Sequence, residues 1–252
     1  MGAPILQALL DAQDRGEIPG GQITCVIASK PGVYALERAA AHGIPGKVLE
    51  RKAYPDAHAY SAAMRDLLLA EQADLVVYAG FLTILDEQVV DAFPGKMMNI
   101  HPALIPSFCG KGYYGLHVHE AVLQSGVKLT GATVHFVTAD CDAGPIIAQK
   151  AVPVLEGDTP EVLQRRVMEQ CEWQLLPQAV ALFCQDKIQI TGNKDPYFRL
   201  RYIMEIQQLS TLLSGNSYPR PWDRVGPQQG RKNGNDRLFY YGAQHQFPQP
   251  CV

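Results

Sequence analysis

The sequence predicts an α/β fold with a doubly wound, mostly parallel sheet. Three observations support this class. Short apolar runs alternate with amphipathic stretches over the first 194 residues, apolar residues make up 47% of the chain, and 252 residues can bury a sizeable core. Strands that alternate with helices usually form a parallel sheet covered on both faces.

The strands are predicted from short apolar runs and the helices from amphipathic ones. The expected strands are 23–29, 47–50, 74–80, 96–102, 132–138 and 146–154. The expected helices are 5–14, 33–42, 59–72, 86–93 and 116–125, followed by a last helix from Pro160 to about Cys184. Thr159 is a suitable N-cap for that helix, and proline is favoured in a first turn.

Composition indicates where in the cell the protein is expected. The longest apolar runs are well short of the roughly 18 residues that span a bilayer, and no charged segment with an apolar signal core follows Met1. The six cysteines are scattered without metal-binding spacing, in a chain too long to need disulfides. These features predict a cytoplasmic protein without a membrane partner.

The C-terminal part differs from the rest. Seven of the 22 basic residues and three of the 25 acidic ones follow Asp195, so the tail carries +4 and the remainder −7. We expect one domain over 1–194, a short helix within 195–213, and a mostly disordered, Gly/Pro/Gln-rich tail over 214–252. A basic tail with aromatic residues could contact nucleic acid, but a solvated linker is the favoured interpretation.

The first candidate site residues end an apolar strand. In Met-Met-Asn-Ile-His-Pro, period-two alternation places Asn99 and His101 on one face, and Pro102 then terminates the strand. Ligands of doubly wound sheets bind at the carboxyl ends of strands. Either residue alone is as compatible with a structural role as with a catalytic one, but the two together indicate a polar crevice.

A second polar group follows the strand at 132–138. Asp140 and Asp142 lie in a Gly-containing loop that lacks the further oxygen ligands of a calcium site. His135, inside an apolar strand, is more typical of a satisfied core residue. His117 and His119 are two residues apart on a helix and do not share a face. We therefore predict no metal site.

Three segments, in this order and spacing, resemble the phosphoribosylglycinamide formyltransferase family: NIHPALIP, GLHVHEAVL and TGATVHFVTADCDAGPIIAQ. The resemblance covers roughly residues 2–194 and implies a Rossmann-like formyltransferase fold. AGFLTIL, ending at Leu85, resembles the family's folate-binding segment. CEWQLLP resembles its glycinamide-binding segment, and FCGKGYYG resembles a variant loop of part of the family.

The resemblance implies a folate-dependent step of purine biosynthesis. An amine of glycinamide ribonucleotide attacks the formyl carbon of 10-formyltetrahydrofolate, which serves as co-substrate. Asn99 would donate to the developing oxyanion, and His101 would donate or move a proton. Asp142 would raise the pKa of His101, because a nearby carboxylate favours the imidazolium. No metal is implied.

Further site residues are implied by the same resemblance. The co-substrate would contact Leu82, Thr83, Ile84, Leu85, Asn99, Thr138, Ala139 and Asp140. Glycinamide ribonucleotide would contact Gly80, Pro102, Glu169 and Glu172. A homodimer is compatible with the resemblance. Formyltetrahydrofolate deformylase, methionyl-tRNA formyltransferase and an inactive nucleotide-binding module remain as alternatives.

The N-terminus departs from the family pattern. Family members open with a strand and a Gly-rich phosphate loop, whereas here the first helix starts almost at once. We hypothesise that Met1 is an internal or misassigned start and that roughly ten residues, one typical strand plus a turn, precede it. The given chain should then hold the phosphate poorly, with Arg51 and Lys52 as substitutes, and should expose a strand edge.

Overall fold

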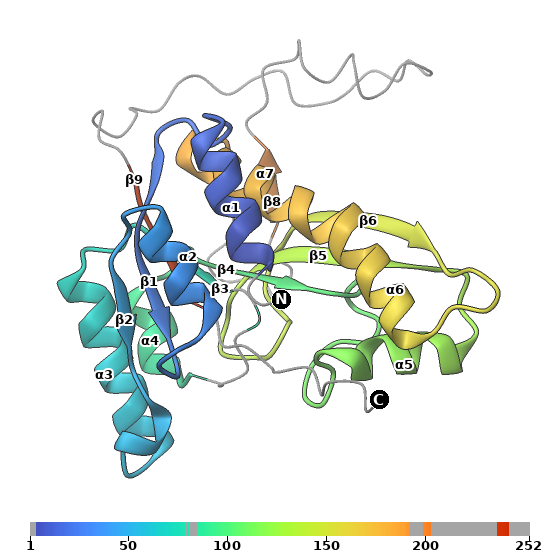
Figure 1. Ribbon diagram of the computed structural model, residues 1–252, viewed down its shortest axis with the longest axis horizontal. Helices are drawn as coiled ribbons and strands as arrows, with labels where there is room; N and C mark the ends of the chain where they lie inside the picture. The colour runs from blue at the N-terminus through green and yellow to red at the C-terminus, as the bar shows by residue number, and fades with distance from the viewer. Residues whose placement is uncertain (1–3, 79, 81–84, 192–198, 203–235, 242–252) are drawn as a thin grey trace.

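A computed structural model describes residues 4–78, 80, 85–191, 199–202 and 236–241. Its main sheet has seven strands in the order β2-β1-β9-β3-β4-β5-β6 (Figure 1). Their bounds are Gly46–Val48, Gly21–Ala28, Asp236–Tyr241, Leu75–Tyr78, Met97–His101, Leu129–Phe136 and Ile146–Pro153. The strands pair in parallel from β2 to β4, and β5 and β6 join antiparallel. The mostly parallel α/β fold is therefore confirmed.

The helices agree with the predicted ones to within a few residues. They are α1 (Pro4–Asp14), α2 (Tyr34–Ala41), α3 (Ala57–Ala70), α4 (Glu87–Ala92), α5 (Leu116–Ser125), α6 (Pro160–Val167) and α7 (Trp173–Cys184), with a 3-10 turn at Arg51–Ala53. A π-helical segment, η2 (Met168–Glu172), joins α6 to α7. Thr159 accepts a hydrogen bond from the Val162 amide, as predicted for its N-cap.

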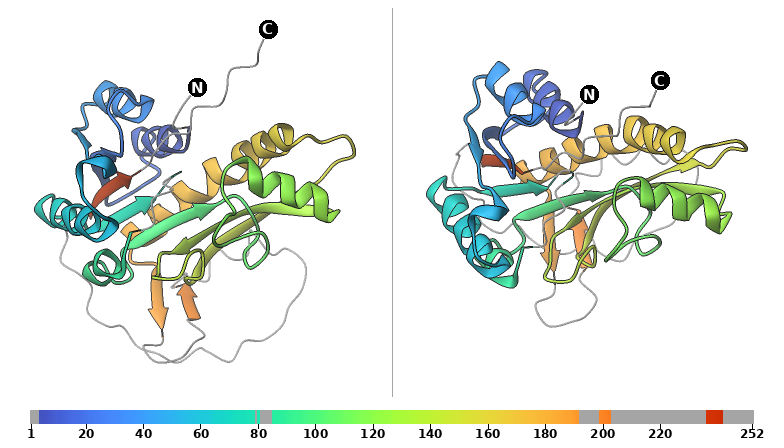
Figure 2. Two further views of the ribbon diagram at one scale, coloured as in Figure 1. Left: turned by 90° about the horizontal axis from the view of Figure 1, so that it is seen from below. Right: turned by 60° about the horizontal axis from the view of Figure 1, so that its bottom comes forward.

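The sheet separates two apolar clusters. Leu75 and Val77 of β3 belong to the cluster that includes α1, α6 and α7, whereas Val76 and Tyr78 belong to the cluster of α3 and α4. This alternation follows from the two-residue period of a strand. Figure 2 shows α1 and α7 on one face and α3 on the other. Within the described part of the chain, no helix has the length and apolarity needed to cross a membrane.

The C-terminal region corrects two predictions. Residues 199–202 form strand β8, which pairs antiparallel with β7 (Ile188–Thr191), where we expected a helix. Residues 236–241 form β9, inside a tail that we expected to be disordered. A six-residue run of which three residues are aromatic shows too little periodicity to be identified from sequence, and two flanking strands supply its hydrogen bonds. The rest of the predicted tail lies outside the described residues.

The position of β9 corrects a further expectation. We expected the chain, lacking a first strand, to expose a strand edge at the sheet centre. In the structure β9 pairs with both β1 and β3, so the described inner edges of these two strands have a partner. The hypothesis of an upstream segment remains a prediction.

Candidate active site

Asn99 and His101 lie in the last three residues of β4, between β3 and β5. The His101 side chain is buried, with 4% of its surface exposed, and Asn99 is partly buried. Asn99 pairs directly with His135 across the antiparallel β4–β5 ladder. Directly paired residues share a face, and the Asn99 amide nitrogen accordingly lies 3.2 Å from His135 Nε2.

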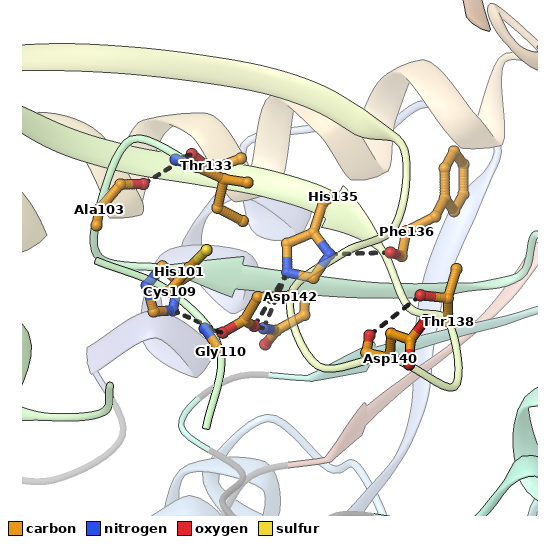
Figure 3. A network of polar contacts seen from close by, with 12 residues as sticks. His101, Ala103, Cys109, Gly110, Thr133, His135, Phe136, Thr138, Asp140 and Asp142 are labelled. Carbon is orange, nitrogen blue, oxygen red and sulfur yellow. Dashed lines mark hydrogen bonds and ion pairs between the residues drawn. The ribbon is translucent and has the colours of Figure 1, made fainter. Parts of the chain in front are cut away.

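Asp142 lies on the loop between β5 and β6, and its carboxylate faces His101 and His135 (Figure 3). One oxygen lies 3.5 Å from His101 Nδ1 and accepts a hydrogen bond of 2.9 Å from the Gly110 amide. The other lies 3.5 Å from the Asn99 amide nitrogen and from His135 Nε2. The predicted catalytic residues are therefore brought together.

Two features show how firmly the loop holds this carboxylate. Asp142 has a φ of 55°, a left-handed conformation that non-glycine residues seldom adopt. Only 8% of its side chain is exposed. Strained residues of this kind persist where surrounding contacts fix them, and they are often found at functional sites.

The ionisation of Asp142 is set by its neighbours. Burial by itself raises the pKa of the carboxyl, but the hydrogen bond with His135, the nearby His101 and the Gly110 amide together lower it to about 2. Asp142 is consequently a carboxylate at neutral pH.

The pKa of His101 is set by two opposing effects, of which we predicted one. Burial lowers it below the ordinary value, and this effect outweighs the raising effects of Asp142 and of the Phe108 carbonyl. Asp142 does favour the imidazolium, as predicted, but the net direction is downward. His101 therefore gives up its proton more readily than an exposed histidine.

Hydrogen bonds assign the His101 tautomer. Nε2 lies 2.8 Å from the Phe108 carbonyl oxygen, which can only accept, so Nε2 carries a hydrogen. Nδ1 faces the Asp142 carboxylate. Protonation at Nδ1 would turn this second contact into an ion pair.

Three site residues were not predicted. His135, expected in the core, donates from Nδ1 to the Phe136 carbonyl over 2.9 Å and presents Nε2 to Asn99 and Asp142. The Phe108 carbonyl and the Gly110 amide complete the surroundings. The β4–β5 register that brings His135 to Asn99 is a long-range pairing, and backbone contacts leave no side-chain signal in the sequence.

A second network fixes the chain that follows His101. The Thr133 hydroxyl donates to the Ala103 carbonyl over 2.7 Å and accepts from the Ile105 amide over 3.1 Å (Figure 3). Thr133 is fully buried and pairs with His101 across the ladder. Buried hydrogen bonds of this type hold a loop in one conformation.

The residues expected to contact the co-substrate are only partly described. Leu82, Thr83 and Ile84 lie outside the described residues, and Leu85 is 9% exposed. Ala139 and Asp140 are exposed on the loop that carries Asp142. In the same loop the Thr138 hydroxyl donates to the Asp140 carbonyl over 3.1 Å. These loop residues flank the site without adding to its hydrogen-bond network.

The expected substrate residues lie in three places. Gly80, with a φ of 65°, follows β3, and Pro102 follows His101. Glu169 and Glu172 both lie on the π-helical segment, where Glu169 is exposed and Glu172 is 7% exposed. Burial raises the pKa of Glu172 to about 7. Within the described structure, neither glutamate bonds to Asn99, His101 or Asp142.

The π-helical segment has a local cause. Pro177 lies inside α7 and has no amide hydrogen to donate to the preceding turn, so regular α-helical bonding is interrupted there. Single turns of π-helix are frequent at functional sites. In the described part of the chain, no group of three or more His, Cys, Asp or Glu side chains is placed to hold a metal ion.

Comparisons define the class of protein. Residues 2–180 match the family model described as formyl transferase, so the chain belongs to the formyl transferase family of enzymes. It is 35% identical to phosphoribosylglycinamide formyltransferase of Haemophilus influenzae, over 75% of this chain and 85% of the relative. The crystal structure of glycinamide ribonucleotide transformylase 1 from Symbiobacterium toebii superimposes with a TM-score of 0.72 and 41% identity, covering 79% of this chain and 89% of that one.

Longer relatives share the same region. The chain is 42% identical to the bovine (Bos taurus) trifunctional purine biosynthetic protein adenosine-3 over 75% of its own length, but it spans only 18% of that protein. It is 39% identical to the chloroplastic phosphoribosylglycinamide formyltransferase of Arabidopsis thaliana, covering 58% of that relative. The predicted family and its Rossmann-like formyltransferase fold are confirmed.

Proposed function

We propose that this chain transfers the formyl group of 10-formyltetrahydrofolate to the amine of glycinamide ribonucleotide, a step of purine biosynthesis in the cytoplasm. The observation that carries the proposal is the contact of Asn99, His101 and Asp142 in a formyl transferase. The names of the relatives favour this reaction over deformylation of formyltetrahydrofolate or formylation of methionyl-tRNA.

The reaction needs partners for two changes of charge. The amine nitrogen attacks the formyl carbon, the carbonyl oxygen becomes negative, and the attacking nitrogen must lose a proton. The bond from carbon to the folate nitrogen then breaks as that nitrogen receives a proton. A donor for the oxyanion and a group that moves protons therefore suffice.

Asn99 supplies the donor. His135 Nδ1 donates to a carbonyl, so in the neutral ring Nε2 accepts one hydrogen of the Asn99 amide, whereas in the protonated ring Nε2 donates to Asp142 instead. The contact with the neutral ring orients the amide, and its second hydrogen, whose nearest acceptor is 3.5 Å away on Asp142, can turn to the oxyanion. His135 is thus a positioning residue for Asn99.

His101, paired with Asp142, would carry the proton between the attacking amine and the folate nitrogen. An imidazolium at His101 would be paired with the Asp142 carboxylate through Nδ1, while burial keeps the histidine pKa low enough for proton release. Nε2–H is held by the Phe108 carbonyl, so movement of the Phe108 loop would present this donor to the reacting groups. A low-dielectric, water-poor site strengthens each of these contacts.

The remaining proposed contacts bind the two small molecules. Leu82 to Leu85, Thr138, Ala139 and Asp140 would line the co-substrate, as the family resemblance implies. Glu172 would contact glycinamide ribonucleotide together with Gly80, Pro102 and Glu169. A cationic amine beside Glu172 would stabilise its carboxylate, which burial alone disfavours.

The test measures formyl transfer to glycinamide ribonucleotide and, in parallel, formate release to water. We expect transfer in the parent chain, and Asn99→Ala and His101→Ala should each lower turnover by roughly 100-fold, as loss of an oxyanion donor does in other enzymes. His58→Ala, an exposed histidine on α3, is the matched control and should retain turnover. Formate release without transfer, or near-normal turnover of the His101 variant, would refute the proposal.

A further inference from the structure

The centre of the sheet contains a gap that a distant segment fills. Strands β1 and β3 do not pair with each other, and β9 lies between them, parallel to both (Figure 1). Its register with β1 runs from Gly21↔Asp236 to Ile27↔Tyr241, and its register with β3 runs from Leu75↔Leu238 to Tyr78↔Tyr241. In a parallel strand paired on both sides, successive backbone groups bond to alternate neighbours.

The walls of this gap are buried. Cys25, Val26 and Ile27 of β1 are fully buried, and every residue of β3 is at most 8% exposed. The apolar clusters above and below the sheet keep water away from both strands. An unpaired strand edge in such surroundings would leave buried N–H and C=O groups without partners, which is costly.

The gap is also connected to the candidate site. In the ladder, Tyr241 of β9 pairs with Tyr78, Tyr78 pairs with Asn99, and Asn99 pairs with His135. These four residues form one row across four neighbouring strands. The end of β9 therefore supports the strand that lies beside Asn99.

We propose that the gap between β1 and β3 is a binding site for one extended parallel strand, and that Asp236–Tyr241 is the segment that fills it and holds Asn99 in position. All six residues pair with β1, the last four also pair with β3, and the run Leu238–Tyr241 is rich in aromatic residues that favour strands. The effect on turnover rests on formyl transfer as the function; the strand site itself does not.

Hydrogen exchange of the intact chain tests occupancy without altering it. The amides of residues 238–240 should exchange at least about 100-fold more slowly than those of an unstructured peptide, with protection similar to Val76 and Val77, because a central strand opens only with the domain. Exchange at the unstructured rate would overturn the proposal. Exchange is repeated at concentrations where light scattering gives a monomer; protection that persists in the monomer supports filling by the chain's own segment, and protection that is lost with the dimer would refute it.

Leu238→Pro tests the role of the backbone, with Leu238→Ile as the matched control. Proline removes an amide hydrogen from a central strand, whereas isoleucine keeps it and favours strands. Leu238→Pro should lower the melting temperature by roughly 10 °C, deprotect the β1 and β3 amides, and reduce turnover; Leu238→Ile should leave all three close to the parent. Equal melting temperatures for parent and Leu238→Pro would contradict the proposal. If Leu238→Pro precipitates, the exchange experiment on the intact chain decides.

If no variant and no parent sample transfers formyl groups, the function proposed above fails. The exchange and melting results would still decide whether the strand occupies the gap. The two proposals are therefore separable.

Discussion

Asp142 and Glu172 are two buried carboxyl groups in different regions, and their surroundings give opposite results. Asp142 lies on the β5–β6 loop among two histidines and a backbone amide, and its pKa falls to about 2. Glu172 lies on the π-helical segment, where burial is the cause that acts on its carboxyl group, and its pKa rises to about 7. Burial disfavours the charge at both positions, and only the Asp142 region compensates for it.

The difference between the two pKa values indicates a different role for each region. The Asp142 region is already organised around a negative charge and can stabilise a cation at His101 before any substrate arrives. The Glu172 region favours its carboxylate only when a cation is supplied. We infer that the first region suits chemistry and the second suits recognition of a cationic group.

The largest expected effect is on turnover and comes from removing the negative charge of Asp142. Asp142→Asn keeps the shape of the side chain but ends the attraction to a protonated His101 and alters the contacts with His135. We expect turnover to fall by roughly 100-fold or more, as at other electrostatically organised sites. Steady-state formyl transfer measures this effect.

The control for Asp142→Asn is Asp91→Asn, at an exposed carboxylate on α4. It should leave turnover within about twofold of the parent, because an exposed charge is screened by solvent. Comparable turnover of Asp142→Asn and the parent would break the distinction between the two regions.

Glu172, whose burial no neighbour in the described structure offsets, should make the protein less stable as pH rises. A carboxyl group with a lowered pKa, such as Asp142, has the opposite effect. Unfolded glutamate titrates near its ordinary pKa of 4.5, whereas folded Glu172 titrates at about 7. Between these values the folded state binds more protons, so the free energy of unfolding falls as pH rises, by about 2.5 kcal/mol from pH 5 to pH 8. Glu172→Gln should abolish this loss and be more stable than the parent at pH 8.

Denaturant unfolding at pH 5 and pH 8 measures the loss. Glu169→Gln, three residues earlier and exposed, is the matched control and should follow the parent at both values. An equal pH dependence in the Glu172→Gln variant and the parent would show that Glu172 has a partner in solution. The two regions would then differ less than the structure indicates.

The sequence predicted the parts of the fold that depend on local pattern. Helix α5 has the predicted bounds, and the six strands up to β6 occur where apolar runs were found. Asn99 and His101 could be paired because the alternation of a strand is local. Asp142 was placed beside them only through the family resemblance, since loop geometry carries no periodic signal.

The sequence could not predict what depends on contacts between distant segments. His135 joins the site through the β4–β5 register, and β9 enters the sheet after a long stretch without periodicity. The raising effect of Asp142 on the His101 pKa was predicted, but the lowering effect of burial was not, for the same reason. A neighbouring carboxylate could be inferred from motifs, but the degree of burial that outweighs it is a property of the whole packed domain.

The smallest expected effect concerns His119, a buried base. Burial without a partner should here make the protein less stable as pH falls, whereas at Glu172 it makes the protein less stable as pH rises. His119 on α5 is fully buried, and neither ring nitrogen has a hydrogen-bond partner within the described structure. Burial, with a smaller effect of His101, lowers its pKa to about 4. The unfolded state therefore binds more protons between about pH 4 and 6.5, and this part of the stability is lost as pH falls below 6.5, by about 2 kcal/mol at pH 5.

The His119→Leu variant tests this loss. Its free energy of unfolding, relative to the parent, should be higher at pH 5 than at pH 8 by about that amount, whereas His117→Leu, at an exposed histidine of the same helix, should show no such gain. Unfolding curves of the three proteins at both pH values measure the gain. A gain independent of pH would mean that His119 titrates normally in the folded state, and burial without a partner would then not explain the contrast between Glu172 and Asp142.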